Sequence, residues 1–576
     1  MGMSGVSREY REELVVWLRK CGCLCQFDHG GRPVYPDLLD TLSRSRHACE
    51  VSQLPDEGPA GVRVAPAAGD RGAVDGTAAG CAVDGFERSV ALFSELIGWL
   101  AGEQARDLEH SQLEARLAED GRELLRALLQ DHLDLRASDE QRLELVVGAD
   151  GIRRPNVERA HERELQSVFG GVQVRRLSYR ARGAENVYPA DAGLNLPAEK
   201  HSHGLRRLAA LEAPRTSFED AQAAILRQTG QQLGKRQLRE LAVAAAHDFK
   251  AFYEQRQRIA TEKRDVLVLS CDAKGVVMRH DALREQTRKQ AEGASTKLAA
   301  RLSKGEKRAR KRMAEVCAVY EIQPAVRTAA DILPTDQDER TAAQPAPKAK
   351  NKWLSASVTD DASTLVAEMF TEADRRDPEH QRTWVALVDG NNHQIDRITK
   401  EARKRKLKVT IVVDLIHVLE YLWSAAWSFF TEGDPAAERW VHNKARAILE
   451  GKAGIVAASI RRKATRLGLE PKQREGADRA ANYLLAKRRH LDYPTALQNG
   501  WPIATGVIEG ACRHLVKDRM DITGARWGLE SAEAILKLRA LINNNDFDQY
   551  WNFHLAQEHR RVHASRYALG VIPQSP

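Results

Sequence analysis

The 576-residue sequence lacks several features that would assign it to particular protein classes. No uninterrupted apolar run reaches the roughly 18 residues that a membrane-spanning helix needs. The first twenty residues lack the basic, apolar and small-residue succession of a secretory signal peptide. No internal repeat is found. We therefore expect a cytoplasmic protein of three or four structural units, with no membrane partner.

Paired cysteines are also missing. The eight cysteines include no CxxC pair, which excludes the usual cysteine patterns of a disulfide framework or a zinc site. The CGCLC cluster at residues 21–25 could bind a metal, but it has no partner pair elsewhere in the chain. We interpret the cysteines as reduced thiols.

Positive charge, in contrast, is concentrated in one segment. The net charge of the chain is +8. Residues 279–312 contain twelve Lys and Arg against four Asp and Glu, so 12 − 4 = +8 falls in this segment. Such a run is either a solvated helix face or a surface for a polyanion. It is compatible with a nucleic-acid partner.

The periodicity of apolar residues predicts the organisation of the first half. We expect a mainly helical region at 1–150, with a Gly-, Ala- and Pro-rich linker at about 54–85. This region supports helical packing or assembly. Alternation around Gly170 predicts a small β unit at 151–200, with four arginines exposed for phosphates: Arg175, Arg176, Arg180 and Arg182.

Residues 201–258 predict a helix-turn-helix. Ser217 and Asp220 form a helix-start signature, and Gly230 to Gly234 make a short turn before a second helix. Helical hairpins are also common in proteins that bind no DNA. If the unit binds DNA, Lys235 and Arg236 at the start of the second helix are candidate contacts.

Runs of β-branched residues then predict an α/β core at 259–423. Residues 265–279 are interpreted as a buried strand, a turn and a second strand, and 312–322 as a third strand. A fourth and a fifth strand, at 383–391 and 407–413, enclose a short basic helix in β-α-β order. The remaining predicted segments are a basic insertion at 280–312, a loop at 328–352, a helical insertion at 424–497, the last part of the core at 498–545 and a tail at 546–576.

Three acids stand out by their positions. Asp272 follows VLVLSC, Asp389 follows WVALV, and Glu509 lies in a predicted helix that Thr505 would cap. Carboxylates beyond neighbouring buried strands converge at one edge of the sheet, although each alone could be only a turn or helix cap. The helix would also present Arg513 and Lys517 on the same face as Glu509, at i+4 and i+8.

A cluster of carboxylates is costly to bury unless divalent cations neutralise it. Mg²⁺ or Mn²⁺ prefers oxygen ligands. Two such ions would activate the attacking water or 3′-hydroxyl and stabilise the leaving oxygen in an in-line phosphoryl displacement. The acids therefore indicate a candidate metal-dependent site.

Four motifs in order, CDAKGVVMR, VDGNNHQIDRI, VVDLIHVLEYLW and IATGVIEGACRHLVKDRMDITGARWG, resemble transposases of bacterial insertion sequences. The resemblance is to the ISKra group, which is related to Mutator-like enzymes, and it covers about residues 150–542. It implies an RNase H-like catalytic core with Asp272, Asp389 and Glu509 as the DDE residues. The intervals are 389 − 272 = 117 and 509 − 389 = 120. Terminal inverted repeats and target DNA would be the partners, in a bacterial, nucleoid-associated protein.

The same resemblance implies further site residues. Asp414 and His417 match a carboxylate-and-histidine pair, so Asp414 competes with Asp389 as the second metal ligand. His417 could orient a phosphate or water, or it could be a structural residue near an apolar strand end. Arg526 and Trp527 could contact DNA, although Trp527 could equally pack in the core. The zinc-ribbon cysteines that relatives often carry are absent around residues 180–183.

The basic segment supplies further candidate contacts to the DNA backbone: Lys307, Arg308, Arg310, Lys311 and Arg312. Because two transposon ends must be synapsed, a homodimer or larger assembly is expected. Two other functions stay open, a non-catalytic, domesticated DNA-binding protein and a structure-selective nuclease with the same core. Strand-transfer products would distinguish the three.

Overall fold

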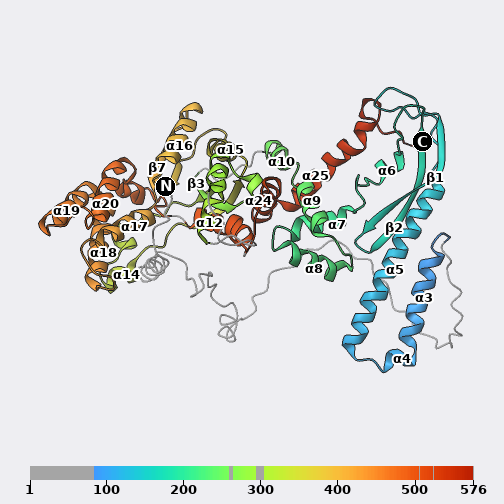
Figure 1. Ribbon diagram of the computed structural model, residues 1–576, viewed down its shortest axis with the longest axis horizontal. Helices are drawn as coiled ribbons and strands as arrows, with labels where there is room; N and C mark the ends of the chain where they lie inside the picture. The colour runs from blue at the N-terminus through green and yellow to red at the C-terminus, as the bar shows by residue number, and fades with distance from the viewer. Residues whose placement is uncertain (1–83, 258–263, 294–303, 505, 523, 575–576) are drawn as a thin grey trace, which may run out of the picture. The chain divides into compact units, whose positions relative to one another are not determined.

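The computed structural model describes residues 84–257, 264–293, 304–504, 506–522 and 524–574 (Figure 1). Contact clustering separates Gly85–Pro576, the second unit of the chain, from the residues before it. The CGCLC cluster and almost all of the predicted linker at 54–85 lie outside the described residues. Within the described ranges, no helix is both long and apolar enough to cross a membrane.

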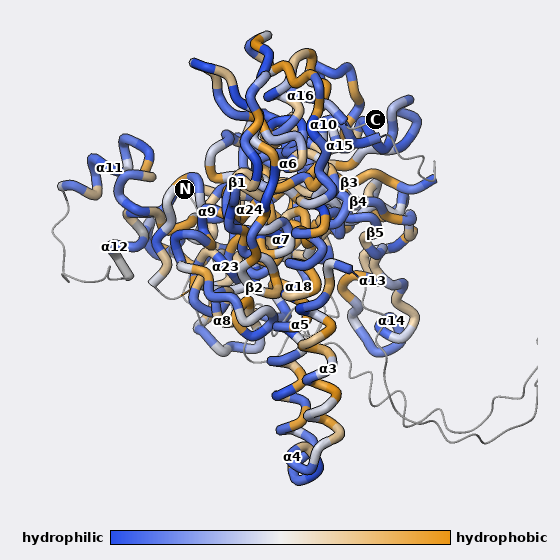
Figure 2. Tube along the Cα trace, turned by 90° about the vertical axis from the view of Figure 1, so that its right-hand side faces the viewer, coloured by the Kyte–Doolittle hydropathy of each residue, from blue (hydrophilic) through white to orange (hydrophobic). Residues whose placement is uncertain are grey.

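The second unit begins with three helices: α3 Glu87–Ala101, α4 Glu103–Arg106 and α5 His110–Asp139. The prediction of helices is confirmed for these residues. It was wrong for residues 140–150, since α5 ends at Asp139. Hydrophobic and hydrophilic residues alternate along α3 and α5 (Figure 2). Four large apolar side chains of α3 are exposed at spacings of three and four residues, namely Val90, Phe93, Ile97 and Leu100. Such a stripe is typical of a helix that packs against another helix.

A two-stranded antiparallel hairpin follows, with β1 Asn156–Ser167 and β2 Gly170–Arg180, as the alternation predicts. Gly170 in its turn has a φ of 140°. Arg175, Arg180 and Arg182 are exposed, but Arg176 is buried, with its Nε 2.7 Å from Asp191. The prediction was wrong for Arg176 because neighbouring residues of a strand point to opposite faces, and Arg176 lies on the buried one.

Five helices connect the hairpin to the sheet: α6 Pro189–Gly193, α7 His203–Glu212, α8 Phe218–Thr229, α9 Lys235–Ala245 and α10 Phe249–Gln255. The Oγ of Ser217 caps α8 by accepting the backbone N–H of Asp220 at 3.1 Å. Gly230 ends α8 with a φ of 71°, a left-handed conformation that favours glycine. Helices α8 and α9 therefore form the predicted pair with a short turn between them.

The central sheet has five strands: β3 Val266–Val277, β4 Lys311–Ile322, β5 Ala349–Ser357, β6 Trp384–Val388 and β7 Val409–Val413. Their order is β5-β4-β3-β6-β7. Strand β4 is antiparallel to β3 and β5, whereas β3, β6 and β7 run parallel. The connection from β6 to β7 contains α16 Asn392–Lys404, the predicted basic helix. The protein is thus a mixed α/β protein.

Two strand predictions were wrong, although the number of strands was right. Residues 265–279 hold one strand and no turn, because β4 pairs along the whole of β3, from Val266 with Ile322 to Val277 with Lys311. Strand β5 lies where part of the loop at 328–352 was predicted. Three of its first four residues, Lys350 to Lys352, are polar, as is common in an edge strand, and this hides the strand pattern.

The other helices before β7 are short or cover the sheet: η1 His280–Ala282, α11 Glu285–Glu292, α12 Lys304–Ala309, α13 Ala329–Ile332, α14 Gln337–Ala342 and α15 Ala362–Arg376. After β7 come α17 Leu415–Ala426, α18 Pro435–Leu449, α19 Ala453–Arg466, α20 Glu475–Ala486, η2 Arg488–His490, α21 Tyr493–Gln498, α22 Val507–Ala511, a π-helix Cys512–Lys517, α23 Asp518–Met520, α24 Leu529–Asn543, α25 Phe547–Val562, η4 Ala564–Arg566 and η5 Ala568–Gly570. Residues 424–497 are thus largely helical. Residues 546–576, predicted as a tail, include the long helix α25.

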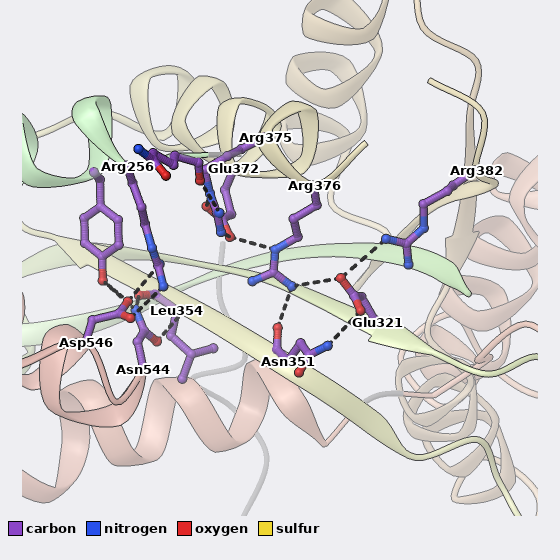
Figure 3. A network of polar contacts seen from close by, with 12 residues as sticks. Arg256, Glu321, Asn351, Leu354, Glu372, Arg375, Arg376, Arg382, Asn544 and Asp546 are labelled. Atoms are coloured by element: carbon purple, nitrogen blue, oxygen red, sulfur yellow. Dashed lines mark hydrogen bonds and ion pairs between the residues drawn. The ribbon is translucent and has the colours of Figure 1, made fainter. Parts of the chain in front are cut away.

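A network of buried arginines and acids lies near the start of β3 (Figure 3). The carboxylate of Glu321, on β4 opposite the second residue of β3, lies 3.6 Å from Arg376 and 3.4 Å from Arg382. Glu372 of α15 accepts hydrogen bonds from Arg375 and Arg376, each with a contact of 2.7 Å. Each acid therefore has arginine partners, which compensates its buried charge.

Candidate active site

Three aspartates lie level with one another across three neighbouring parallel strands. Paired residues of β3 and β6 differ in number by 117 (387 − 270), and those of β6 and β7 by 25 (413 − 388). The same differences separate Asp272 from Asp389 and Asp389 from Asp414. Because neighbouring strands are about 4.8 Å apart, the register brings the three carboxylates to one edge of the sheet.

Asp272 and Asp389 lie beside each other at this edge. Asp272 is half-buried and lies inside β3, since β3 continues beyond the predicted strand end. Its Oδ2 accepts a hydrogen bond from the thiol of Cys512 at 3.3 Å. Asp389 directly follows β6, and its Oδ1 accepts the backbone N–H of Asn391 at 2.7 Å. Burial raises the pKa of Asp389, and the charge of Asp272 adds to this effect.

The loop after Asp389 is held by residues of the helical segment. The hydroxyl of Tyr483 on α20 donates to the backbone oxygen of Asp389 at 3.0 Å. The Tyr483 ring stacks on Tyr421 of α17, with 3.8 Å between ring centroids. Gly390 has a φ of 88°, and a Cβ at this position would overlap the Tyr483 hydroxyl. Glycine is therefore needed here for both conformation and space.

Asp414 and His417 lie at the start of α17. Asp414 is 1% exposed, and its Oδ1 caps the helix by accepting the backbone N–H of Ile416 at 2.7 Å. The Nδ1 of His417 lies 3.1 Å from Glu420. Burial by itself would lower the pKa of His417, but the hydrogen bond to Glu420 and the charge of Asp414 raise it to about 9. His417 is thus a cation at neutral pH that offsets nearby acids, whereas a metal ligand needs a neutral imidazole.

Glu509 lies in the first turn of α22, which begins after Gly506. Thr505, the predicted cap, is outside the described residues. The chain continues as a π-helix over Cys512–Lys517. The α-helical spacing that predicts Glu509, Arg513 and Lys517 on one face does not apply across a π-helix, which frequently occurs at functional sites. It is Cys512 that contacts Asp272 from this segment.

All the predicted acids line one narrow pocket. The residues that line it are Ser270, Cys271, Asp272, Leu387, Val388, Asp389, Asp414, His417, Ile508 and Glu509. Glu509 is an exposed residue, yet the surroundings that partly bury its carboxyl and the charge of Asp414 raise its pKa to about 8. Four carboxylates and one cation, His417, therefore share the pocket lining. Acids outnumber cations, which is the arrangement of perturbed groups expected at a functional site.

The donor set fits a divalent metal ion in chemistry, because carboxylate oxygens are the ligands that Mg²⁺ and Mn²⁺ prefer. The side chains are not yet gathered around one point. Among the described residues, no group of three or more His, Cys, Asp or Glu side chains is arranged to hold a metal ion. An ion bound between Asp272, Asp389 and Glu509 would require their side chains to turn toward one another.

The predicted DNA contacts between β3 and β4 lie on α12 and at the start of β4: Lys307, Arg308, Arg310, Lys311 and Arg312. Lys311 is exposed, and the side chain of Arg308 is outside the described ones. The Nε of Arg312 donates to the backbone oxygen of Val358 at 2.6 Å. Burial lowers the pKa of Arg312. The Arg312 side chain thus connects the start of β4 to the residue after β5.

Lys235 and Arg236 begin α9, where both are exposed and form ion pairs with Glu219 and Glu240. They keep the orientation toward solvent that a DNA contact requires.

The other predicted contacts differ in exposure. Lys517 and Arg526 are exposed. Arg513 lies 3.7 Å from Asp518. Trp527 is 4% exposed, and its Nε1 donates to the backbone oxygen of Met520 at 3.0 Å, so it packs in the core and does not present a ring to DNA.

Several residues at the site were not predicted from the sequence. Glu315 on β4 and Arg397 on α16 line a second small pocket that borders Asp272. Burial raises the pKa of Glu315, and the charge of Arg397 opposes this effect. A lone acid in the apolar run AEVCAVY was a readable signal for Glu315. Tyr483 gave no such signal, because its contact with Asp389 spans 94 residues.

We compared the sequence with models of known protein families and with curated proteins, and neither comparison found a match.

Proposed function

We propose that this protein is a DDE-type DNA transposase that cleaves transposon ends and joins them to target DNA. The observation that carries the proposal is the common level of Asp272, inside β3, and of Asp389 and Asp414, directly after the parallel strands β6 and β7, with Glu509 in the same pocket. A five-stranded mixed sheet with acids at one edge is compatible with the RNase H-like core that the sequence resemblance implies. The four motifs that carry the resemblance contain all of these acids.

Asp272, Asp389 and Glu509 would hold two Mg²⁺ or Mn²⁺ ions. The chemistry that such ions supply when bound is activation of the attacking oxygen and stabilisation of the leaving one. In cleavage, the oxygen of water bonds to phosphorus as the bond to the 3′ oxygen breaks, which frees a 3′-hydroxyl. In strand transfer, this hydroxyl attacks a phosphodiester of target DNA and displaces its 3′ oxygen. Neither step needs a covalent protein intermediate.

Asp389 is our choice for the second acid because it borders Asp272 and is only half-buried. Asp414 is buried and already caps α17. The protonated His417 would offset the negative charge of the acids and of an incoming phosphate.

The remaining parts of the chain would bind and align DNA. Helices α8 and α9 would recognise the terminal inverted repeats, with Lys235 and Arg236 near the backbone. Lys307, Arg310, Lys311 and Arg526 would contact phosphates. A homodimer or larger assembly would synapse two ends.

The test is to incubate the purified full chain with Mg²⁺ or Mn²⁺ and DNA that carries the ends of its own element. We expect cleaved and joined products from wild type, and none from Glu509→Gln or Asp389→Asn, although both variants still bind the ends. Asp414→Asn keeps the helix cap and should retain measurable cleavage.

Other results would change the proposal. Cleavage by Asp389→Asn but not by Asp414→Asn would exchange the roles of the two aspartates. Cleavage of branched DNA without joining would indicate a structure-selective nuclease. Specific binding by folded protein without any cleavage would favour a domesticated DNA-binding protein.

A further inference from the structure

The helical segment after β7 carries a group of cations that pack on aromatic rings outside the acid pocket. The Nζ of Lys463 on α19 lies 3.9 Å from the ring centroid of Phe430 and 5.6 Å from that of Trp440. The Nζ of Lys444 on α18 lies 5.9 Å from the Trp440 centroid. The Trp440 and Phe429 rings meet edge to face at 5.4 Å. The rings thus form a base on which two ammonium groups are held.

Two arginines complete this basic–aromatic surface, which we define as Lys444, Arg462, Lys463 and Arg466 with the rings beneath the lysines. Arg462 and Arg466 are exposed, and both lie on α19 beside Lys463. Burial lowers the pKa of both lysines, and the charges of Arg462 on Lys444 and of Arg466 on Lys463 add to this effect. The four cations are therefore close enough to repel one another.

The cations of this surface have no acidic partner: in the part of the chain that the structure describes, none of the four forms an ion pair with Asp or Glu. Other basic residues of the same segment do. Arg446 lies 2.7 Å from Glu339, Arg474 2.8 Å from Asp478, and Arg479 3.0 Å from Glu475. The absence of acids is thus a property of this surface and not of the whole segment.

Like charges held together at a half-buried site cost free energy that an anionic partner would recover. The partner would meet ammonium and guanidinium groups, because the Lys463 ammonium lies over the Phe429 and Phe430 rings. A base that stacked on the same side of these rings would have to displace the lysine. Phosphate groups at regular spacing fit this surface better than bases do.

We infer that the basic–aromatic surface binds the phosphate backbone of double-stranded DNA without reading its sequence. The inference rests on the proposed function and adds a DNA contact outside the acid pocket. The same helical segment holds the loop of Asp389 through Tyr483 and Lys487, so DNA bound by this segment is connected to the candidate active site through packed helices.

The test measures binding of full-length protein to a random-sequence 30-base-pair duplex, without divalent metal, by fluorescence anisotropy at several salt concentrations. The slope of log affinity against log salt is negative, and each lost phosphate contact reduces its magnitude by about 0.9. We expect Arg462→Gln/Arg466→Gln to lose about 1.8 in slope and to bind about tenfold more weakly at 0.15 M salt.

The matched control is Arg474→Gln/Arg479→Gln, which removes two arginines that already have acidic partners, and its slope should stay at the wild-type value. Lys463→Arg keeps the charge and should also keep the slope, whereas Lys463→Gln should reduce its magnitude by about 0.9. Thermal unfolding of each variant shows that it is folded.

An unchanged slope in Arg462→Gln/Arg466→Gln, or an equal loss in the control, would overturn the inference and leave the proposed function standing. Failure of the proposed function alone would give a different pair of results. A transposase assay without cleavage, together with the expected slopes, would overturn the proposed function and keep the DNA surface.

Discussion

Two clusters of charged side chains lie at different levels of β3, one near its start and one beside Asp272 in its middle, and they differ in how their charge is balanced. In the network of Figure 3, Glu321 and Glu372 share three arginines. In the acid pocket, four carboxylates share one cation, His417. Despite burial, the arginines hold the pKa of Glu372 below its ordinary value, whereas burial and the charge of Asp414 raise the pKa of Glu509 to about 8. The balanced cluster supports the fold, and the unbalanced one is costly unless a metal or substrate completes it.

The largest expected effect comes from neutralising one acid of the pocket. Asp272→Asn should reduce DNA cleavage by at least about 1000-fold, because a metal ligand is lost. The amide oxygen can still accept the hydrogen bond from Cys512. The free energy of unfolding, measured with urea, should stay equal to that of wild type or rise, because one repulsive charge is removed. A clear loss of stability would show that Asp272 supports the fold as the network acids do.

The opposite result is expected in the balanced network. Glu372→Gln leaves Arg375 and Arg376 buried without their carboxylate, so the free energy of unfolding should fall by about 3 kcal/mol. The matched control is Glu475→Gln, whose carboxylate is exposed and pairs with Arg479, and it should lose less than about 0.5 kcal/mol. If both variants lost the same unfolding free energy, the buried ion pairs of Glu372 would contribute no more to stability than an exposed pair does.

A smaller effect tests how the loop of the acid pocket is held. Gly390→Ala places a Cβ against the Tyr483 hydroxyl at a positive φ, and we expect a loss of about 2 kcal/mol in unfolding free energy. Adding Tyr483→Phe removes the hydroxyl and should recover part of this loss. If Gly390→Ala were as stable as wild type, Tyr483 would not constrain the Asp389 loop.

The smallest effect concerns Glu368, a partly buried acid whose negative charge is only partly offset, by Lys250. Burial raises its pKa to about 7, although Lys250 opposes this effect. The folded state then binds a proton more tightly than the unfolded state between about pH 4.5 and pH 7, so stability falls as the pH rises through this window.

The measurement is the unfolding free energy of wild type minus that of Glu368→Gln at pH 5 and pH 8. We expect this difference to decrease by about 1 kcal/mol with rising pH, since partial exposure weakens the effect. A difference that does not change with pH would show that Glu368 titrates normally.

The positions of the three aspartates could be predicted from the sequence because each follows a short apolar run that lies within, or makes up, a parallel strand. Asp389 directly follows β6, which lies inside the sheet, and Asp414 directly follows β7, which lies at its edge. The α/β core and the hairpin were predicted for the same reason, namely that their alternation or apolar runs are local signals.

The rest depends on pairing between distant segments. Strand β3 continues past Asp272 only because β4 pairs with it, and β5 has its buried residues in its second half alone. The π-helix after Glu509 and the contact of Cys512 with Asp272 have no sequence pattern of their own. The balance of charge in the two clusters likewise follows from tertiary contacts between residues far apart in the chain.

The most direct test of the central claim is to count the Mn²⁺ ions bound by the full chain, by electron paramagnetic resonance at millimolar Mn²⁺. If the excess negative charge of the acid pocket serves to bind metal ions, wild type should bind at least one more Mn²⁺ than Asp272→Asn and Glu509→Gln do. The control Glu475→Gln should bind as many ions as wild type. If folded wild type binds no Mn²⁺, or Asp272→Asn binds as much as wild type, the pocket is not a metal site and the account is contradicted.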